Sequence, residues 1–186
     1  MESFNYLSVL LSIVIGLAIT QVLQGLRQLI LTRTKVKLYL PTLIWAGLAL
    51  LIAIQGWWAS FSMHMRANWT FLALLVVMLQ AIAVYMVAAL VLPDVNPEKV
   101  VDLREHYFAH RRWFFGALLA TTIFSLAKGP ALNDHFTGGL DLLFHVIFCI
   151  AALAAMLTGR EWIHRVLTPI MALIFVVYIA LLFARL

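Results

Sequence analysis

Charged side chains are scarce in this chain of 186 residues. Aspartate, glutamate, lysine and arginine make up 11% of it, while hydrophobic residues make up 65%. In a soluble domain roughly a quarter of the residues are charged, because the apolar core has to be covered by a polar surface. The composition therefore excludes a soluble globular domain and predicts an integral membrane protein.

Cysteine is almost absent too, with Cys149 as the only one. A single thiol cannot form an intramolecular disulfide or supply several thiolate ligands, so we interpret Cys149 as a small buried residue. The chain also lacks a Walker loop, an HExxH motif and a dinucleotide glycine pattern. We therefore expect no cofactor. Whether the protein is an enzyme stays open, with a non-enzyme favoured.

Carboxylates are missing from the middle of the long apolar stretches. All eight acidic residues lie in tails, loops or stretch ends, namely Glu2, Asp94, Glu98, Asp102, Glu105, Asp134, Asp141 and Glu161. Proton-coupled carriers usually hold a carboxylate near the bilayer midplane, where it relays protons or binds cations. This absence argues against a carboxylate-driven pump or antiporter, though not against a passive pore.

Six long apolar stretches occupy most of the chain. A bilayer core of about 30 Å requires about 20 apolar residues in a helix. The stretches that meet this length, or nearly do, are 6–31, 38–61, 69–92, 107–127, 140–157 and 163–183. We predict an all-α fold, a polytopic bundle of six transmembrane helices in a single domain, 1–186.

The basic residues are divided unevenly between the two ends of these spans. Ten of the 13 share one side, namely Arg27, Arg33, Lys35, Lys37, Lys99, Arg104, Arg111, Arg112, Arg160 and Arg165. Because cytoplasmic loops are enriched in lysine and arginine, both termini are predicted to be non-cytoplasmic. The basic residues form no nucleic-acid-binding face, so membrane lipid is the expected partner and nucleic acid is not.

The longest polar connection divides the chain into 1–93, 94–112 and 113–186. Each outer part holds three spans, so the second must enter the membrane from the opposite face, and a repeat would be inverted. A short similarity between Val84-Tyr85-Met86 and Val177-Tyr178-Ile179 supports such a repeat. Two inverted three-helix halves are therefore one prediction for the architecture.

The central connection itself predicts a helix. Asn96 is a good helix cap and Pro97 fits the first helical position. Val100, Leu103 and Tyr107 then recur on one face of that helix. The pattern predicts an amphipathic helix that lies on the cytoplasmic surface and runs into the fourth span.

Proline and glycine mark two further features. Gly129 and Pro130 predict that the fourth span ends at Lys128. Pro169 lies inside the sixth span and removes one backbone hydrogen bond there, which predicts a kink near Thr168.

Neutral polar side chains remain within the spans. In the first span, Ser8, Ser12, Gly16, Thr20, Gln24 and Gln28 follow one another at steps of four residues, with Gln21 beside them. Such a ridge suits close helix packing, the favoured interpretation, or a polar pathway. The candidates for a pathway or polar core are Thr20, Gln21, Gln24, Gln55, Gln80, Thr121, Thr122 and His145. Buried amides need partners, so these groups should point inward, around a cavity or as staples between helices.

One histidine pair is a weak metal candidate. Asp102, His106 and His110 stand at steps of four on one helical face, and two histidines so spaced can share a metal ion. His145 is the only histidine well inside a span, and we interpret it first as a core histidine with satisfied hydrogen bonds.

Several segments resemble small six-span bacterial inner-membrane proteins. These are the opening Phe4-Asn5-Tyr6-Leu7-Ser8, the Trp57-Trp58 pair, Leu92-Pro93-Asp94 and the run REHYFAHRRWFF from Arg104 to Phe115. The resemblance covers essentially the whole chain. It implies a bacterial inner (plasma) membrane, but no activity and no site residues.

Two classes of function fit these observations. The first is a transport or permeation unit for a small solute or ion, which we expect to be a homo-oligomer. The alternative is a non-transporting module, an assembly partner or sensor that acts through the helix near 96–112. A membrane enzyme that uses His106 and His110 is a third and weaker hypothesis. A polar cavity that connects the spans would favour transport over the module.

Overall fold

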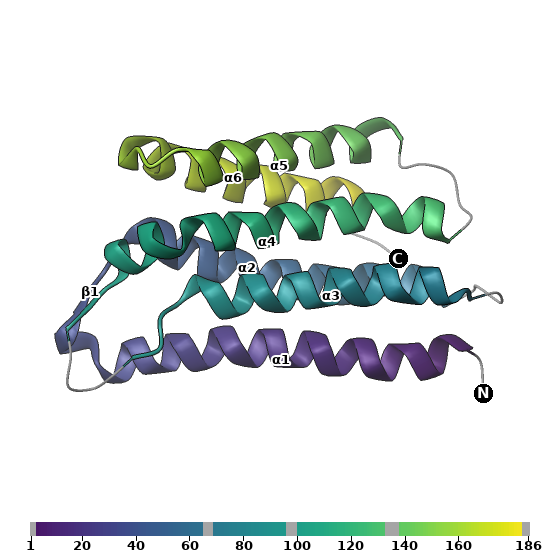
Figure 1. Cartoon of the computed structure of the whole chain (residues 1–186), viewed down its shortest axis with the longest axis horizontal. Helices are drawn as coiled ribbons and strands as arrows, with labels where there is room; N and C mark the ends of the chain where they lie inside the picture. Colours follow the sequence, from purple (N-terminus) through teal and green to yellow (C-terminus); the bar gives the residue numbers. More distant parts are fainter. Residues whose placement is uncertain (1–2, 65–68, 96–99, 133–137, 184–186) are drawn as a thin grey trace.

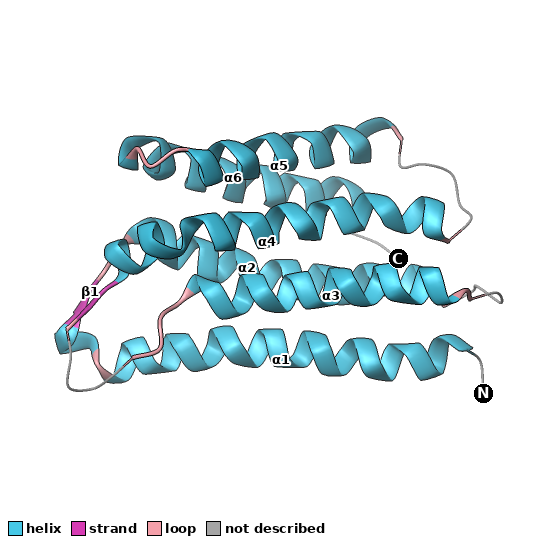
Figure 2. Ribbon diagram, in the orientation of Figure 1, coloured by secondary structure: helices cyan, strands magenta, loops and turns pink. Residues whose placement is uncertain are grey.

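The fold was analysed in a computed structural model, which describes residues 3–64, 69–95, 100–132 and 138–183. It is all-α (Figures 1 and 2). The long helices are α1 (Ser3–Leu31), α2 (Leu40–Ser60), α3 (Phe71–Val91), α4 (Leu103–Ala131), α5 (Gly139–Leu157) and α6 (Glu161–Leu182). The short elements are the 3-10 helices η1 (Arg33–Lys35) and η2 (Phe61–Met63) and the strands β1 (Val36–Lys37) and β2 (Val101–Asp102). All six long helices have the length and apolar character needed to cross a membrane.

The helices run side by side along the long axis of the molecule (Figure 1). At one end the two strands form a short parallel ladder, in which Val36 pairs with Val101 and Lys37 with Asp102. We call this the ladder end. The opposite end, where α1 begins and α6 ends, is called the terminal end. The ladder ties the segment before α2 to the start of α4, and so fixes these two helices relative to each other.

Helix α3 packs against α1 and α2, and most extensively against α4. Helix α2 contacts α1, α3 and α6, while α5 packs against α4 and α6. Small buried residues such as Ala46, Ala49 and Ala88 allow the backbones to approach closely, as membrane helices require. At Gly25 a Cβ atom would lie 2.8 Å from the side chain of Leu92, the residue after α3, so a larger residue there would force this side chain to shift.

Helix α4 differs from the prediction at both ends. No separate amphipathic helix is seen within the described residues, and Asn96 and Pro97 lie outside them. Instead α4 is one continuous helix from Leu103, about 43 Å long and thus longer than a bilayer core. Leu103 and Tyr107, expected to face the membrane surface, are buried inside the bundle. Their apolar surface is covered by other helices, which removes the need for a surface-bound segment.

The other end of α4 was also predicted wrongly. The helix does not stop at Lys128 but continues through Gly129 and Pro130 to Ala131. A proline in the last turn removes only one backbone bond, and the turn is closed because the amide of Leu132 donates to the carbonyls of Lys128 and Gly129. Pro169 likewise lies within α6 without ending it.

Candidate functional site

A cavity of about 100 Å³ lies inside the bundle, between α2, α3, α4, α5 and α6. On α2 its lining extends from Trp45 to Gly56, about 16 Å along the helix axis, so it occupies the middle part of the membrane-spanning region. Its polar lining residues are Gln55, Gln80, Thr121, Thr122, Ser125 and His145. The remaining lining is mostly apolar and includes the rings of Phe115, Phe148, Phe175 and Tyr178. The space is large enough for several water-sized groups.

The two glutamines of this main cavity have free carboxamides. Gln55 on α2 and Gln80 on α3 both line the cavity and are half-buried. Within the part of the chain that the structure describes, neither side chain forms a hydrogen bond to the protein. In an apolar surrounding an unpaired amide is costly, so both groups are available to water or to a solute.

The two threonines use their hydroxyl hydrogens locally. Thr121 donates to the carbonyl of Ala117 at 2.9 Å, and Thr122 donates to that of Leu118 at 3.0 Å. These bonds run to the preceding turn of the same helix, as is common for threonine in helices. The cavity therefore meets hydroxyl oxygens that can still accept hydrogen bonds.

At the terminal end of the main cavity, His145 belongs to a hydrogen-bond network between three helices. Its Nδ1 lies 2.8 Å from the carbonyl oxygen of Asp141 and 3.1 Å from the carboxylate oxygen Oδ1 of the same residue. Both are acceptors, so Nδ1 carries a hydrogen and donates it. Nε2 lies 3.1 Å from the hydroxyl of Ser125 on α4, and Tyr178 on α6 donates to Asp141 Oδ1 at 3.1 Å. The buried imidazole thus has a partner at each nitrogen.

A second, smaller cavity of about 20 Å³ adjoins the first. The two share Gly56, Gln80 and Val84 in their linings. The smaller cavity is lined by residues of α1, α2 and α3, mostly apolar, and by Lys128 of α4. Gln80 therefore lies at the boundary between the main cavity and the smaller cavity, which Lys128 lines.

The main cavity is closed toward the ladder end by packed side chains. Trp45 contacts the rings of Phe114 and Phe115 at centroid distances of 5.4 Å, and its Nε1 donates to Thr168 Oγ1 at 3.0 Å. One turn further, His164 is 0% exposed. Its Nε2 must donate to the carbonyl of Thr158 at 3.1 Å, so its Nδ1 accepts from the Tyr107 hydroxyl at 2.9 Å. This layer joins α2, α4 and α6.

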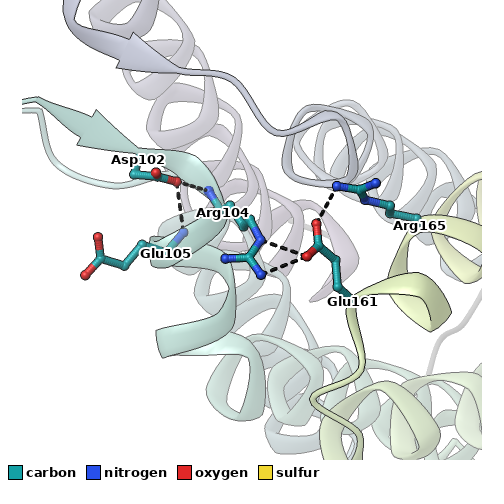
Figure 3. Close-up of polar contacts among 5 residues, drawn as sticks. All are labelled: Asp102, Arg104, Glu105, Glu161 and Arg165. Atoms are coloured by element: carbon teal, nitrogen blue, oxygen red, sulfur yellow. Dashed lines mark hydrogen bonds and ion pairs between the residues drawn. The ribbon is translucent and has the colours of Figure 1, made fainter.

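Outside this closed layer, charged groups hold the ladder end together (Figure 3). Glu161 at the start of α6 receives two hydrogen bonds from Arg104 at 2.9 and 2.7 Å, and one from Arg165 at 2.6 Å. Asp102 caps α4, because its Oδ1 accepts from the amides of Arg104 and Glu105 at 3.0 and 3.2 Å. The pKa of Asp102 is held below its usual range, chiefly by the hydrogen bond from the amide of Glu105. The bond from the amide of Arg104 and the nearby charge of Lys37 lower it further.

Five of the eight predicted polar residues meet at the main cavity, namely Gln55, Gln80, Thr121, Thr122 and His145. The three on α1 do not. Thr20 and Gln24 are exposed on the outside of the bundle, and Gln21 is half-buried. Elsewhere on this ridge Ser12 accepts a hydrogen bond from Trp57, and Gln28 accepts one from the amide of Val95. These are hydrogen bonds from the ridge to other parts of the chain.

The weak metal candidate is not assembled as a three-ligand group. Asp102 is engaged by the helix cap, while His106 Nε2 lies 3.2 Å from the carbonyl of Leu90 and His110 Nδ1 lies 3.1 Å from that of His106. The two rings are 4.5 Å apart between centroids. Among the described residues no group of three histidine, cysteine or acidic side chains is placed to hold a metal ion.

Three residues near the cavities were not selected from the sequence: Lys128, Asp141 and Tyr178. Two signals could have found two of them. Asp141 and His145 are four residues apart, which places them on one helix face. Ser125 follows Thr121 by four and Lys128 follows Ser125 by three, so these three share a face as well. Tyr178 carries no comparable signal in the sequence.

These features define a polytopic helical membrane protein with six candidate spans and an internal, mostly apolar cavity. Comparison of the chain with protein-family models, with curated proteins and with solved structures finds no match in any of the three. Function therefore has to be argued from the cavity and its lining.

Proposed function

We propose that this protein binds a small solute in the main cavity and carries it across the membrane. The observation that supports this most directly is the pair of free carboxamides, Gln55 and Gln80, at one cavity within the membrane region. If these amides only held helices together, they would form hydrogen bonds between helices. In a binding site they stay open to a ligand.

The lining favours a small organic solute over a bare ion. A bare cation in a membrane is stabilised by several oxygen ligands at once, commonly backbone carbonyls or carboxylates. Here the polar groups are few and lie among aromatic and aliphatic side chains. Such a mixture is typical of ligand sites that hold an apolar body and orient it with a few polar contacts.

The conformation described is closed toward the ladder end. For release on that side, Trp45 on α2 and Tyr107 on α4 have to separate from α6. The hydrogen bond from Trp45 to Thr168 and that from Tyr107 to His164 are the contacts that such an opening breaks. The positive-inside rule predicts that the ladder end faces the cytoplasm, and on that prediction the proposed path leads from the terminal end outside to the ladder end inside.

The proposal is tested by flux into liposomes that contain the purified protein, with a panel of small neutral, anionic and cationic organic solutes. Gln80→Leu replaces the amide by an apolar group of similar volume and should lower flux per folded protein at least tenfold. The matched control is Gln24→Leu, the same chemical change at an exposed position of α1 that does not line the cavity. It should leave flux within a factor of two.

A wild-type protein that passes none of these solutes, in either membrane orientation, contradicts transport. The alternative would then be the non-transporting module. Its interaction surface would be the charged ladder end around Glu161, where the side chains of Arg104 and Arg165 are exposed.

A further inference from the structure

Lys128 is an unusual cation for its position. Lysines near the end of a membrane helix ordinarily extend toward the headgroups, so that the charged head stays in water. Lys128 instead lines the smaller cavity, where its neighbours from α1, α2 and α3 include Leu11, Val77 and Val84. Of the three basic residues predicted at the terminal end, it is the one that the structure describes, since Arg66 and Arg185 lie outside the described residues.

The charge of Lys128 is not neutralised by a direct contact. Its ammonium forms no hydrogen bond and no ion pair within 4 Å to the described part of the chain. Among the described carboxylates, that of Asp141 is the one whose charge acts on Lys128, at longer range. The Asp141 carboxylate is itself engaged, because Tyr178 and His145 both donate to its Oδ1. Asp141 Oδ1 thus already accepts two hydrogen bonds, whereas the Lys128 ammonium has no direct partner among the described residues and is open to an anionic ligand.

The position of Lys128 connects it to the main cavity. Thr121, Ser125 and Lys128 lie on one face of α4, and the first two line the main cavity. Gln80 lines both cavities, so its amide can donate a hydrogen bond to the same ligand group that contacts the ammonium. A charged donor beside a neutral donor, in apolar surroundings, is an arrangement that suits a carboxylate or a similar oxyanion.

We propose that Lys128 and Gln80 form the head-group site for a small organic anion, whose carboxylate lies between them while its apolar body fills the main cavity. This inference rests on the proposed function and names the class of its solute. A buried ammonium without a partner is unfavourable, and a carboxylate that contacts it offsets this cost. A cationic solute, by contrast, adds a second positive charge to the same space and is disfavoured.

Three solutes with one carbon chain and different head groups test the inference. Binding of labelled butyrate, butanol and butylamine to the purified full-length protein in detergent is measured by equilibrium dialysis at pH 7.5. Butyrate should bind at least tenfold more tightly than either of the other two. Equal binding of butyrate and butanol, or tighter binding of butylamine, overturns the inference while binding in the main cavity remains. Absence of binding for all three overturns both the inference and the binding step of the proposed function.

Variants at Lys128 locate the head-group site. Lys128→Met keeps a long apolar side chain and should reduce butyrate binding to the level of butanol, with butanol binding unchanged. Lys128→Arg keeps the positive charge and should retain most of the preference for butyrate. Unchanged butyrate binding in Lys128→Met overturns the assignment. If that variant does not fold, the comparison of the three solutes in the wild type still shows whether the protein prefers an anionic head group.

Binding and transport fail separately in this design. Butyrate binding that depends on Lys128, without flux of any solute in liposomes, supports the anion site and contradicts transport. Flux of neutral solutes without a preference for butyrate supports transport and contradicts the anion site.

Discussion

The hydroxyl of Tyr178 donates a hydrogen bond to Asp141 Oδ1 at 3.1 Å, and this contact joins the last turns of α6 to the first turn of α5. Asp141 also receives the Nδ1 hydrogen of His145. This carboxylate at the start of α5 thus joins Tyr178 on α6 to His145, which lines the main cavity.

Removing the Tyr178 hydroxyl should destabilise this end of the bundle. Tyr178→Phe keeps the ring, which packs against Phe144 and Phe148, but takes one donor from Asp141. The loss should be on the order of 1 kcal/mol in the free energy of unfolding, measured by thermal unfolding in detergent. Tyr85→Phe is the matched control, because no hydrogen bond of the Tyr85 hydroxyl is seen among the described residues. Equal losses in both variants would contradict a role for the Asp141 contact.

The closed layer at the ladder end makes a second prediction. Tyr107→Phe leaves the Nδ1 of the fully buried His164 without its donor, and an unpaired buried polar group costs about 1–3 kcal/mol. We expect lower thermal stability and faster hydrogen exchange around Tyr107 and His164.

Tyr39→Phe serves as its control. The Tyr39 hydroxyl is buried and makes no hydrogen bond of good geometry among the described residues, although the Arg165 side chain lies near it. Its removal should therefore cost much less than that of the Tyr107 hydroxyl, although the two rings lie side by side at a centroid distance of 5.5 Å. A larger loss in Tyr39→Phe would mean that the bond to His164 contributes little.

The sequence was sufficient for the six helices, because their apolar lengths leave almost no alternative. It failed at the ends of α4 for a physical reason. Whether Leu103 faces a membrane surface or a neighbouring helix depends on tertiary packing, and both environments accept the same residue. Gly129 and Pro130 predict a helix end, but a proline in the last turn disturbs only one backbone hydrogen bond, so α4 continues to Ala131.

For the site, residue type was more informative than position. Polar side chains such as Gln80 and His145 stand out in an apolar helix, and the need for partners predicts that they face inward. The same rule gave no way to distinguish Gln80 from Gln24, since both are amides within a span and only packing determines which faces a cavity. Lys128 was missed because a lysine at a span end is ordinarily interpreted as an anchor in the headgroups.

The cap of α4 makes a third prediction, at the ladder end. Asp102→Ala removes the acceptor of two amides and should destabilise the first turn of α4, seen as faster hydrogen exchange at Arg104 and Glu105. Asp102→Asn keeps a capping oxygen and should cost less. A slowing of exchange in the alanine variant would be the opposite of what the cap requires.

The same cap should depend on pH. The pKa of Asp102 is lowered in the folded protein, chiefly by the hydrogen bond from the amide of Glu105. The stabilisation of α4 by the ionised Asp102 cap is therefore complete at pH values above the ordinary pKa of a carboxyl group. It is lost as the pH falls through the lowered pKa of the folded protein. Once rates are corrected for intrinsic exchange, protection at Arg104 and Glu105 should fall between pH 5 and pH 2 in the wild type. It should fall less in Asp102→Asn, whose cap does not titrate.

The orientation of the bundle is the last prediction, and it rests on the ten basic residues that the sequence groups on one side of the membrane. Cys149→Ser yields a chain without cysteine, into which single reporters can be placed. Ser62 lies at the terminal end and Thr34 at the ladder end, and both are exposed. A cysteine at position 62 should react with a membrane-impermeant thiol reagent added to intact cells, because the positive-inside rule places this end outside. A cysteine at position 34 should react only after the membrane is opened. Labelling of position 34 but not 62 in intact cells would reverse the orientation, and with it the direction of the proposed path.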